Sequence, residues 1–192
     1  QLGLCYIHPE LREGNDEIRL SESRYLPNLI KLEDMKGDLH VHSSWSDGVM
    51  DLKHVIKSAK KLNYEFISFS DHSESNRFGN GLPVEKLDEK KEYIKKINIR
   101  NKKTRFLMGA EIDIDEKGNL DYPSEIIKNF DIALASVHTG FKYDSEINTS
   151  RFIKAMQEKN IDIIAHPTGI VFGSRAPYFM DVDKVIEEAV SK

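Results

Sequence analysis

From Gly37 onward, short apolar runs alternate with longer segments in which apolar residues return every three or four positions. Runs of the first kind are typical of buried strands, and segments of the second kind are typical of amphipathic helices. The chain contains five such runs: "DLHVH", "EFISFSDH", "RFLMGAEIDI", "FDIALASVH" and "IDIIAHP". Because strands that alternate with helices form βα units, the pattern predicts an α/β fold around a largely parallel sheet.

The spacing of apolar residues predicts four helices. The first lies between the first two runs, where one face carries Leu52, Val55, Ile56, Ala59 and Leu62. The second extends from about Pro83 to Arg100, with proline in its first turn and an inward face of Val84, Leu87, Ile94 and Ile97. A third follows Glu146, and a fourth begins near Asp181.

The texture of the chain changes at Gly37. Residues 1–36 are polar, weakly periodic and interrupted by proline and glycine, which indicates a linker. Residues 37–192 contain every apolar run and predict one domain. Because the chain begins with Gln1 and its last helical segment stops at Lys192, we expect a piece of a longer protein in which the C-terminal strands of this domain are missing.

Composition excludes little. A chain of 192 residues, 39% of them hydrophobic, can bury one sizeable core, and a net charge of -4 is too small to predict a nucleic-acid or membrane partner. The single cysteine, Cys5, can form no internal disulfide, so we expect a cytoplasmic protein. No apolar run approaches the roughly 18 residues of a membrane span, so no membrane partner is expected.

Metal-binding residue types lie at or beside the end of every apolar run. These residues are His40 and His42, His72, Glu111, His138 and His166. The carboxyl ends of parallel strands line one site, so side chains that are distant in sequence converge there. On a strand, alternate side chains share a face, which places His40 and His42 on the same side. The sequence therefore predicts a shared metal site.

Imidazole and carboxylate ligands suit zinc, manganese or iron, and a carboxylate can bridge two ions where a neutral imidazole cannot. Glu111 is the candidate bridge. Two ions about 4 Å apart can hold a hydroxide between them and stabilise an in-line displacement at phosphorus. The sequence contains no nucleophile elbow, P-loop or dinucleotide-binding fingerprint, so those enzyme classes are set aside.

Several candidates keep a second interpretation. One His-x-His pair alone fits a structural strand better than a metal site. Asp47 is either a ligand or a turn residue before Gly48, and Asp38 and Asp71 either orient an imidazole or cap the backbone. His8 and His54 are expected at the surface.

Two basic features could contact a polyanion. Arg175 follows the His166 loop and could hold a substrate phosphate, although a surface arginine explains it almost as well. The loop at Asn80 and Gly81 could close over a substrate or be a simple turn. A basic run either tracks a nucleic-acid backbone or, as is more usual, forms a solvated helix face; it comprises Lys86, Lys90, Lys91, Lys95, Lys96, Arg100, Lys102, Lys103 and Arg105.

Five ordered motifs carry a family resemblance. "GDLHVHSSWSDG", "SFSDHS", "GAEIDI", "ASVHTGF" and "IAHPTG" resemble the successive motifs of the PHP superfamily, named for polymerase and histidinol phosphatase. The closest resemblance is to the C-terminal PHP domain of bacterial and archaeal family X DNA polymerases. The upstream "LGLCYIHPELREGNDEI" and "LPNLIKLEDMKGDLHVH" are similar to the junction that precedes the PHP domain in those polymerases.

The resemblance implies a distorted (β/α)7 barrel that holds up to three metal ions, manganese or zinc. It implies that His40 and His42 bind one ion, that Glu111 bridges this ion to a second, and that His138 and His166 complete the second. Asp47 and His72 would bind the third. The family's late Asp-x-His motif is not found, since no histidine follows His166. We therefore expect weak metal binding, or no activity, from this chain alone.

The implied activity is hydrolysis of phosphodiesters at DNA ends through a metal-bridging hydroxide, as a 3'-5' exonuclease in DNA repair. In this hypothesis Glu111, His40 and His42 are catalytic, DNA is the substrate, and the parent protein carries a DNA polymerase module. The first alternative is a small-molecule phosphatase of the histidinol-phosphate type. The second is a structural module without hydrolytic activity.

Overall fold

The computed structural model describes residues 3–192, and the chain divides into two compact units at Met35. The unit that ends at Met35 contains η1 (Pro9–Leu11), α1 (Glu17–Glu22) and η2 (Leu32–Asp34). The buried hydroxyl of Ser21 donates to the carbonyl of Cys5, which ties α1 to the irregular segment before it. The expected linker thus contains short helical turns, and its role as a junction remains a prediction.

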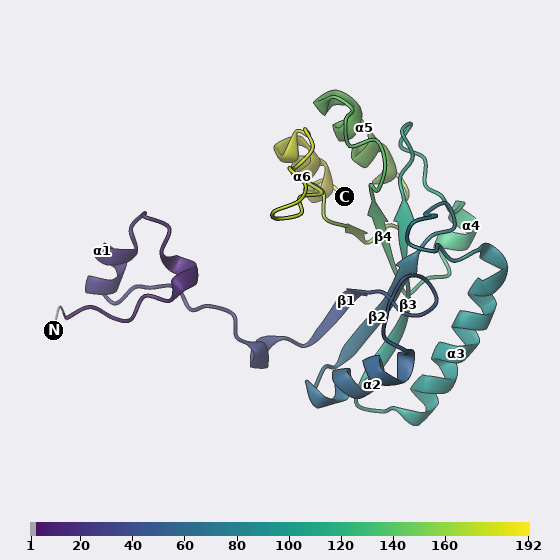
Figure 1. Ribbon diagram of the computed structural model, residues 1–192, viewed down its shortest axis with the longest axis horizontal. Helices are drawn as coiled ribbons and strands as arrows, with labels where there is room; N and C mark the ends of the chain where they lie inside the picture. The colour runs from purple at the N-terminus through teal and green to yellow at the C-terminus, as the bar shows by residue number, and fades with distance from the viewer. Residues whose placement is uncertain (1–2) are drawn as a thin grey trace. The chain divides into compact units, whose positions relative to one another are not determined.

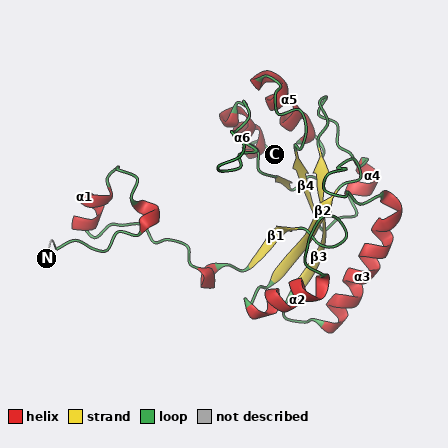
Figure 2. Cartoon of the chain, in the orientation of Figure 1, coloured by secondary structure: helices red, strands yellow, loops and turns green. Residues whose placement is uncertain are grey.

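A five-stranded parallel sheet forms the centre of the second unit, Lys36–Lys192 (Figures 1 and 2). Its strands, in spatial and chain order, are β1 (Gly37–Val41), β2 (Phe66–His72), β3 (Arg105–Asp113), β4 (Ile132–Ser136) and β5 (Ile163–Ile164). Each strand pairs with the next one along the chain in parallel register. Sequential parallel strands with right-handed crossovers curl in one direction, and here the sheet forms a half-barrel.

A helix follows each strand. They are α2 (Leu52–Lys61), η3 (Val84–Lys86) with α3 (Leu87–Arg100), α4 (Ser124–Ile127), α5 (Ser145–Ala155) and α6 (Val182–Val190). Three of them begin at an aspartate whose carboxylate accepts a hydrogen bond from a backbone N–H in the first turn: Asp51 for α2, Asp144 for α5 and Asp181 for α6. Such N-caps satisfy donors that would otherwise lack a partner, so they place the helix starts.

The hydrophobic core lies between the sheet and its helices. β3 is buried along nearly its whole length, and Phe106 and Ile112 have no exposed surface. A central parallel strand is covered on both faces, which explains its nearly continuous apolar sequence. A smaller cluster lies below α5 and α6 and includes Phe152, Tyr178 and Val185.

The predicted α/β class and parallel sheet are confirmed, and all five apolar runs contain strands. The predicted helices are found at α2, at η3 with α3, at α5 and at α6, whereas the short α4 was not predicted. The number of strands in a complete barrel remains a prediction. Within residues 3–192, no helix has the length and apolar character needed to cross a membrane.

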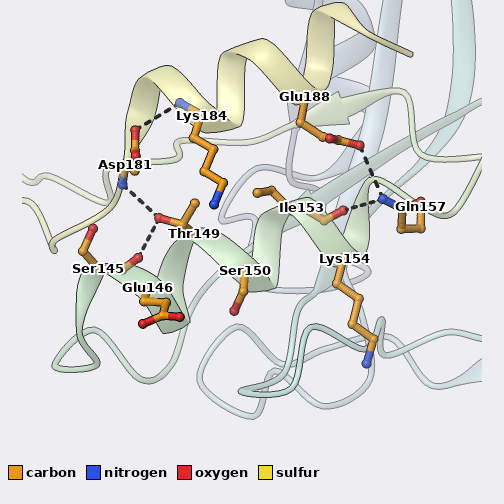
Figure 3. Close-up of a pocket in the computed structure, with 10 residues that line it drawn as sticks. All are labelled: Ser145, Glu146, Thr149, Ser150, Ile153, Lys154, Gln157, Asp181, Lys184 and Glu188. Carbon is orange, nitrogen blue, oxygen red and sulfur yellow. Dashed lines mark hydrogen bonds between the residues drawn. The ribbon is translucent and has the colours of Figure 1, made fainter.

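α6 is attached to α5 through a small set of polar contacts at a shallow hollow between the two helices (Figure 3). The buried hydroxyl of Thr149 donates to the carbonyl of Ser145 at 2.6 Å and accepts from the backbone N–H of Asp181 at 2.9 Å. Asp181 in turn caps α6 through the N–H of Lys184. One threonine hydroxyl therefore links the middle of α5 to the N-cap residue of α6.

We expect Thr149→Val to lower the free energy of unfolding by about 1–3 kcal/mol, because the isosteric side chain leaves the N–H of Asp181 without its partner. Urea unfolding followed by circular dichroism measures the change. Ser150→Ala is the control, since this exposed hydroxyl only bonds back to its own helix, and the expected change is within about 0.5 kcal/mol. Equal effects of the two variants would contradict the link between α5 and α6.

Candidate metal centre

The carboxyl ends of all five strands supply side chains to one pocket of about 880 Å³. His40 lies in β1 and His42 follows that strand directly, while His72 is the last residue of β2. Glu111 lies in β3 in register with His72. His138 and His166 follow β4 and β5 by two residues each. The parallel direction of the strands therefore brings together side chains that are more than 120 residues apart at the extremes.

The carboxylate of Glu111 lies at the centre of these side chains and is 1% exposed. A ring nitrogen of each of five histidines approaches one of its oxygens: His166 at 2.7 Å, His72 at 2.9 Å, His42 at 3.1 Å, His40 at 3.2 Å and His138 at 3.3 Å. Burial raises the pKa of Glu111, but hydrogen bonds from the histidines outweigh it and hold the pKa far below its usual range. Glu111 is therefore a carboxylate in this pocket.

Four groups of donor atoms have the spacing of a metal site, with all atoms of a group within 4.8 Å of one another. The groups are His40, His42 and Glu111; His42, Asp47 and His72; His72, Asp113 and His138; and Glu111, His138 and His166. All seven predicted ligands occur in these groups, and Glu111 belongs to two of them, as do His42, His72 and His138. Their binding of metal remains a prediction.

The donor set fits divalent cations better than it fits hydrogen bonding. Oε2 of Glu111 is buried and has no hydrogen-bond partner of acceptable geometry. Nε2 of His40 and Nε2 of His42 face one another at 3.2 Å, where at most one of them can donate. A cation between converging lone pairs removes both conflicts, and imidazole with carboxylate suits zinc, manganese or iron.

The side chain of Asp47 is positioned by the turn that carries it and not by packing of its own atoms. Its carboxylate is 45% exposed, lies 2.8 Å from Nδ1 of His42 and extends to 3.7 Å from Nε2 of His72. Burial raises the pKa of Asp47. The hydrogen bond with His42 and the charges of His42 and His72 together outweigh burial, so the pKa is lowered. The structure therefore places Asp47 between two imidazoles, as the ligand interpretation requires.

Asp113 was not among the predicted site residues, yet it orients His138. Its carboxylate accepts from Nδ1 of His138 at 2.7 Å, which leaves Nε2 facing Glu111. Burial lowers the pKa of His138, but the bonds to Asp113 and Glu111 outweigh it and raise this pKa to about 9. A signal was available in the sequence, because Asp113 follows Glu111 by two positions on one strand and so shares its face.

Two aspartates that were considered as partners of imidazoles have other roles. Asp38 accepts from the backbone N–H of His40 and not from its ring. Asp71 is buried, bonds to Ser43 and Ser46, and pairs with Lys90 at 2.8 Å. Burial raises the pKa of Asp71, but the Lys90 cation and these hydrogen bonds outweigh it and lower the pKa.

The predicted basic run does not form one exposed face, because Lys90 is only 1% exposed. Both earlier interpretations of this residue, a nucleic-acid contact and a solvated position, are wrong. Lys90 lies three residues after Leu87 and four before Ile94, so it belongs to the buried stripe of α3. His8 and His54 are exposed as expected, and the His54 ring contacts only Asp51 on its own helix.

The rim of the pocket carries aromatic and cationic side chains. Arg175, the predicted substrate contact, lines the pocket; its Nε donates to the carbonyl of Gly169 and its guanidinium lies 4.4 Å from the centre of the Phe141 ring. Phe78 also lines the pocket and is fully exposed. Arg175 is thus oriented by a stacking contact and one hydrogen bond, with other donors of the guanidinium available to a ligand.

Two backbone features bring the loops close to the ligands. A Cβ atom at Gly79 would lie 2.1 Å from Cδ2 of His72, so only glycine allows this loop to cross the ring. His166 has a φ of 28°, a conformation that residues other than glycine seldom adopt. Its carbonyl accepts from the N–H of Gly169, so the ligand lies at a tight turn.

A parallel half-barrel with imidazoles and carboxylates clustered at its strand ends defines a class of α/β proteins with a candidate multinuclear metal centre. A family model described as "PHP domain" matches residues 38–171, and the chain belongs to this family. The resemblance seen in the sequence motifs is thereby confirmed. PHP domains are metal-dependent, and the clustered donors agree with that property.

Three relatives indicate the range of the similarity. The DNA polymerase/3'-5' exonuclease PolX of Bacillus subtilis (strain 168) is 37% identical over 187 residues, which is 97% of this chain and 32% of that protein. A probable phosphatase of Thermoanaerobacter sp. (strain X514) is 39% identical over 88 residues, 44% of this chain and 34% of that protein. A probable phosphatase of Clostridium acetobutylicum is 28% identical over 166 residues, 81% of this chain and 60% of that protein. The chain thus spans about a third of the length of the PolX relative.

We expect metal affinity to increase with pH. The pKa of His138 is raised to about 9, and the pKa of His42 is raised by its hydrogen bond to Glu111, so at lower pH each ring carries a second proton that must leave before its nitrogen binds metal. The apparent affinity for Mn²⁺ should therefore rise about tenfold per pH unit for each proton released, up to about pH 9. Calorimetric titration at several pH values measures it. A constant affinity from about pH 5 to 8 would count against histidine ligands.

We expect Asp113→Ala to weaken metal binding by about 10- to 100-fold, because the ring of His138 loses the partner that fixes its orientation. The matched control is Asp38→Ala, which removes only an exposed backbone contact and is expected to change the affinity less than about threefold. Titration with Zn²⁺ against a chromogenic chelator compares the two variants. A similar loss in both would show that any nearby carboxylate matters, whatever its contact.

Proposed function

We propose that this chain is the metal-dependent phosphodiesterase domain of a family X DNA polymerase and that it removes nucleotides from DNA 3' ends. The observation that carries the proposal is the extent of the similarity to PolX. It covers 97% of the chain, so it includes most of the segment that precedes the PHP match at residue 38. The phosphatase similarity from Thermoanaerobacter covers only 44%.

In this proposal, His40, His42, Asp47, His72, Glu111, His138 and His166 hold up to three manganese or zinc ions at the mouth of a distorted (β/α)7 barrel. When bound, such ions would lower the pKa of a water molecule and neutralise charge on a phosphodiester. Oε1 of Glu111 faces His40, His138 and His166, while Oε2 faces His42 and His72, so one carboxylate contacts both sets of imidazoles. Asp113 holds His138 in the tautomer whose Nε2 faces the pocket.

The rim residues favour a nucleic acid as the substrate. The guanidinium of Arg175 can pair with a phosphate while Phe141 fixes its plane. Phe78 presents an exposed ring at the same pocket, where an unpaired base could stack on it, and such stacking contributes about 1–3 kcal/mol per base. These contacts suit a 3'-terminal nucleotide in a cytoplasmic DNA repair reaction, with the polymerase module supplying the duplex contacts.

The second candidate is a small-molecule phosphatase, favoured by the Clostridium acetobutylicum relative, whose similarity covers 81% of the chain. Turnover of a 3'-recessed DNA and of histidinol phosphate, each with Mn²⁺, separates the two. The assay uses this chain and, in parallel, the product of the complete reading frame that encodes it. Preference for histidinol phosphate would replace the nuclease proposal, and metal binding without hydrolysis of either would favour a structural module.

We expect Glu111→Ala to reduce phosphodiester hydrolysis by roughly 10²- to 10³-fold, the scale observed when a group that organises charge in a transition state is removed. Circular dichroism should show that the fold is retained. Glu125→Ala, an exposed position in the first turn of α4, is the control and should leave the rate unchanged. Full activity of the Glu111 variant would exclude the bridging role.

A further inference from the structure

The ammonium of Lys90 lies inside the protein, below the metal centre. The side chain extends from α3 and is 1% exposed. Its Nζ donates to the carbonyl of Phe69 in β2 at 2.8 Å and to that of Gly109 in β3 at 2.9 Å, and it pairs with Asp71 at 2.8 Å. All three protons thus have partners, and none of these partners is an imidazole. Lys90 joins a helix to two strands and to one buried carboxylate.

The carboxylate of Asp71 transmits this contact to the loop after β1. Its side chain has no exposed surface. Oδ1 accepts from the backbone N–H of Ser43 at 2.7 Å and from the hydroxyl of Ser46 at 2.8 Å, and the hydroxyl of Ser43 lies 2.9 Å from Oδ2. A carboxylate with charged and neutral donors on both oxygens is fixed in position. Asp71 therefore anchors two residues of one short turn.

This turn carries Asp47. We define it as residues 43–48, closed by the carbonyl of Ser43, which accepts from the N–H groups of Ser46 and Gly48. Asp47 is 45% exposed, so packing does little to hold it. Its position between His42 and His72 depends on the turn, and the turn depends on Asp71.

We propose that Lys90 is a positioning residue for the metal centre: through Asp71 it fixes the turn at residues 43–48 and so holds Asp47 against His42 and His72. The inference rests on the proposed function, because it assigns Asp47, His42 and His72 to one metal ion. Removal of the ammonium leaves Asp71 as a buried charge without its counter-ion, a strongly unfavourable state. The turn then loses the rigid acceptor that orients it.

A simpler interpretation is that the pair only stabilises the fold. The two interpretations differ at the turn itself, and the turn carries Trp45, the one tryptophan of the chain. The backbone N–H of Trp45 donates to the hydroxyl of Ser43, and the indole ring packs against the core. The fluorescence of Trp45 therefore reports on the turn directly, without metal and without any assay of activity.

The test replaces Lys90 with methionine, which is similar in length and has no charge. In the metal-free chain, Lys90→Met should shift the Trp45 emission to longer wavelength and raise its acrylamide quenching constant at least about twofold. The double variant Lys90→Met with Asp71→Asn should return the quenching to near the original value. The amide oxygen can still accept from Ser43 and Ser46, while the unpaired buried charge is gone.

Two controls separate positioning from loss of stability. Lys95→Met removes an exposed lysine from the same helix and should change nothing. Arg151→Met removes another buried cation, which donates to the carbonyls of Ile114, Asp115 and Thr139, and should lower stability without altering Trp45 quenching. If Arg151→Met alters Trp45 as much as Lys90→Met does, the proposal is overturned.

Metal binding is the second measurement. Mn²⁺ titration followed by electron paramagnetic resonance should show a binding site that is lost in Asp47→Ala. In Lys90→Met, the Mn²⁺ affinity of this Asp47-dependent site should fall at least about tenfold. The affinity of sites that do not depend on Asp47 should change less than about threefold. If neither this chain nor the product of the complete reading frame binds Mn²⁺, the proposed function fails while the Trp45 result still tests the turn.

A variant in the turn covers the case in which Lys90→Met does not fold. Ser46→Ala removes one of the two hydroxyls that join the turn to Asp71 and leaves the buried ion pair intact. Its Trp45 quenching should rise, and its Asp47-dependent Mn²⁺ affinity should fall. A folded Ser46→Ala chain with unchanged quenching and unchanged Mn²⁺ binding would overturn the proposal.

Discussion

The structure depends on a single constraint: one buried carboxylate, that of Glu111, must face five imidazoles at the carboxyl ends of the strands of a parallel sheet. Such a cluster opposes folding, because it removes polar and charged groups from water. The rigid sheet below it provides the compensation, since β3 is buried along nearly its whole length and joins β2 to β4. The burial of the apolar strands therefore offsets the free-energy cost of burying the polar groups of the site.

The sheet and six of the seven clustered residues could be predicted because they follow from local rules, whereas spacing left Asp47 open between a ligand and a turn residue, and only the family resemblance placed it in the set. Apolar runs predict strands, and parallel strands bring their last residues to one edge. The supporting contacts were harder to predict. Lys90 looked like part of a charged helix face until its partner on β2 was known, and that partner is 19 positions earlier. Asp71 and Asp113 were indistinguishable by type, and only packing shows that Asp113 meets an imidazole while Asp71 meets a lysine.

The site therefore has two parts with different origins. The donors around Glu111 come from the strand ends and belong to the framework that the PHP family model describes over residues 38–171. The rim comes from loops. Gly79 lets the loop that carries Phe78 pass close to the ring of His72, and Arg175 stacks on the ring of Phe141. Loops change more freely than strands, so we infer that substrate preference depends on the rim while the metal chemistry depends on the strand ends.

The unusual backbone of His166 separates fold stability from ligand geometry. A φ of 28° on a residue with a Cβ costs on the order of 1–3 kcal/mol, and the turn to Gly169 maintains it. Glycine would adopt the same conformation without strain but would remove the imidazole that lies 2.7 Å from Glu111. An unstrained backbone and an imidazole beside Glu111 are therefore alternatives at this position, and the chain has the imidazole.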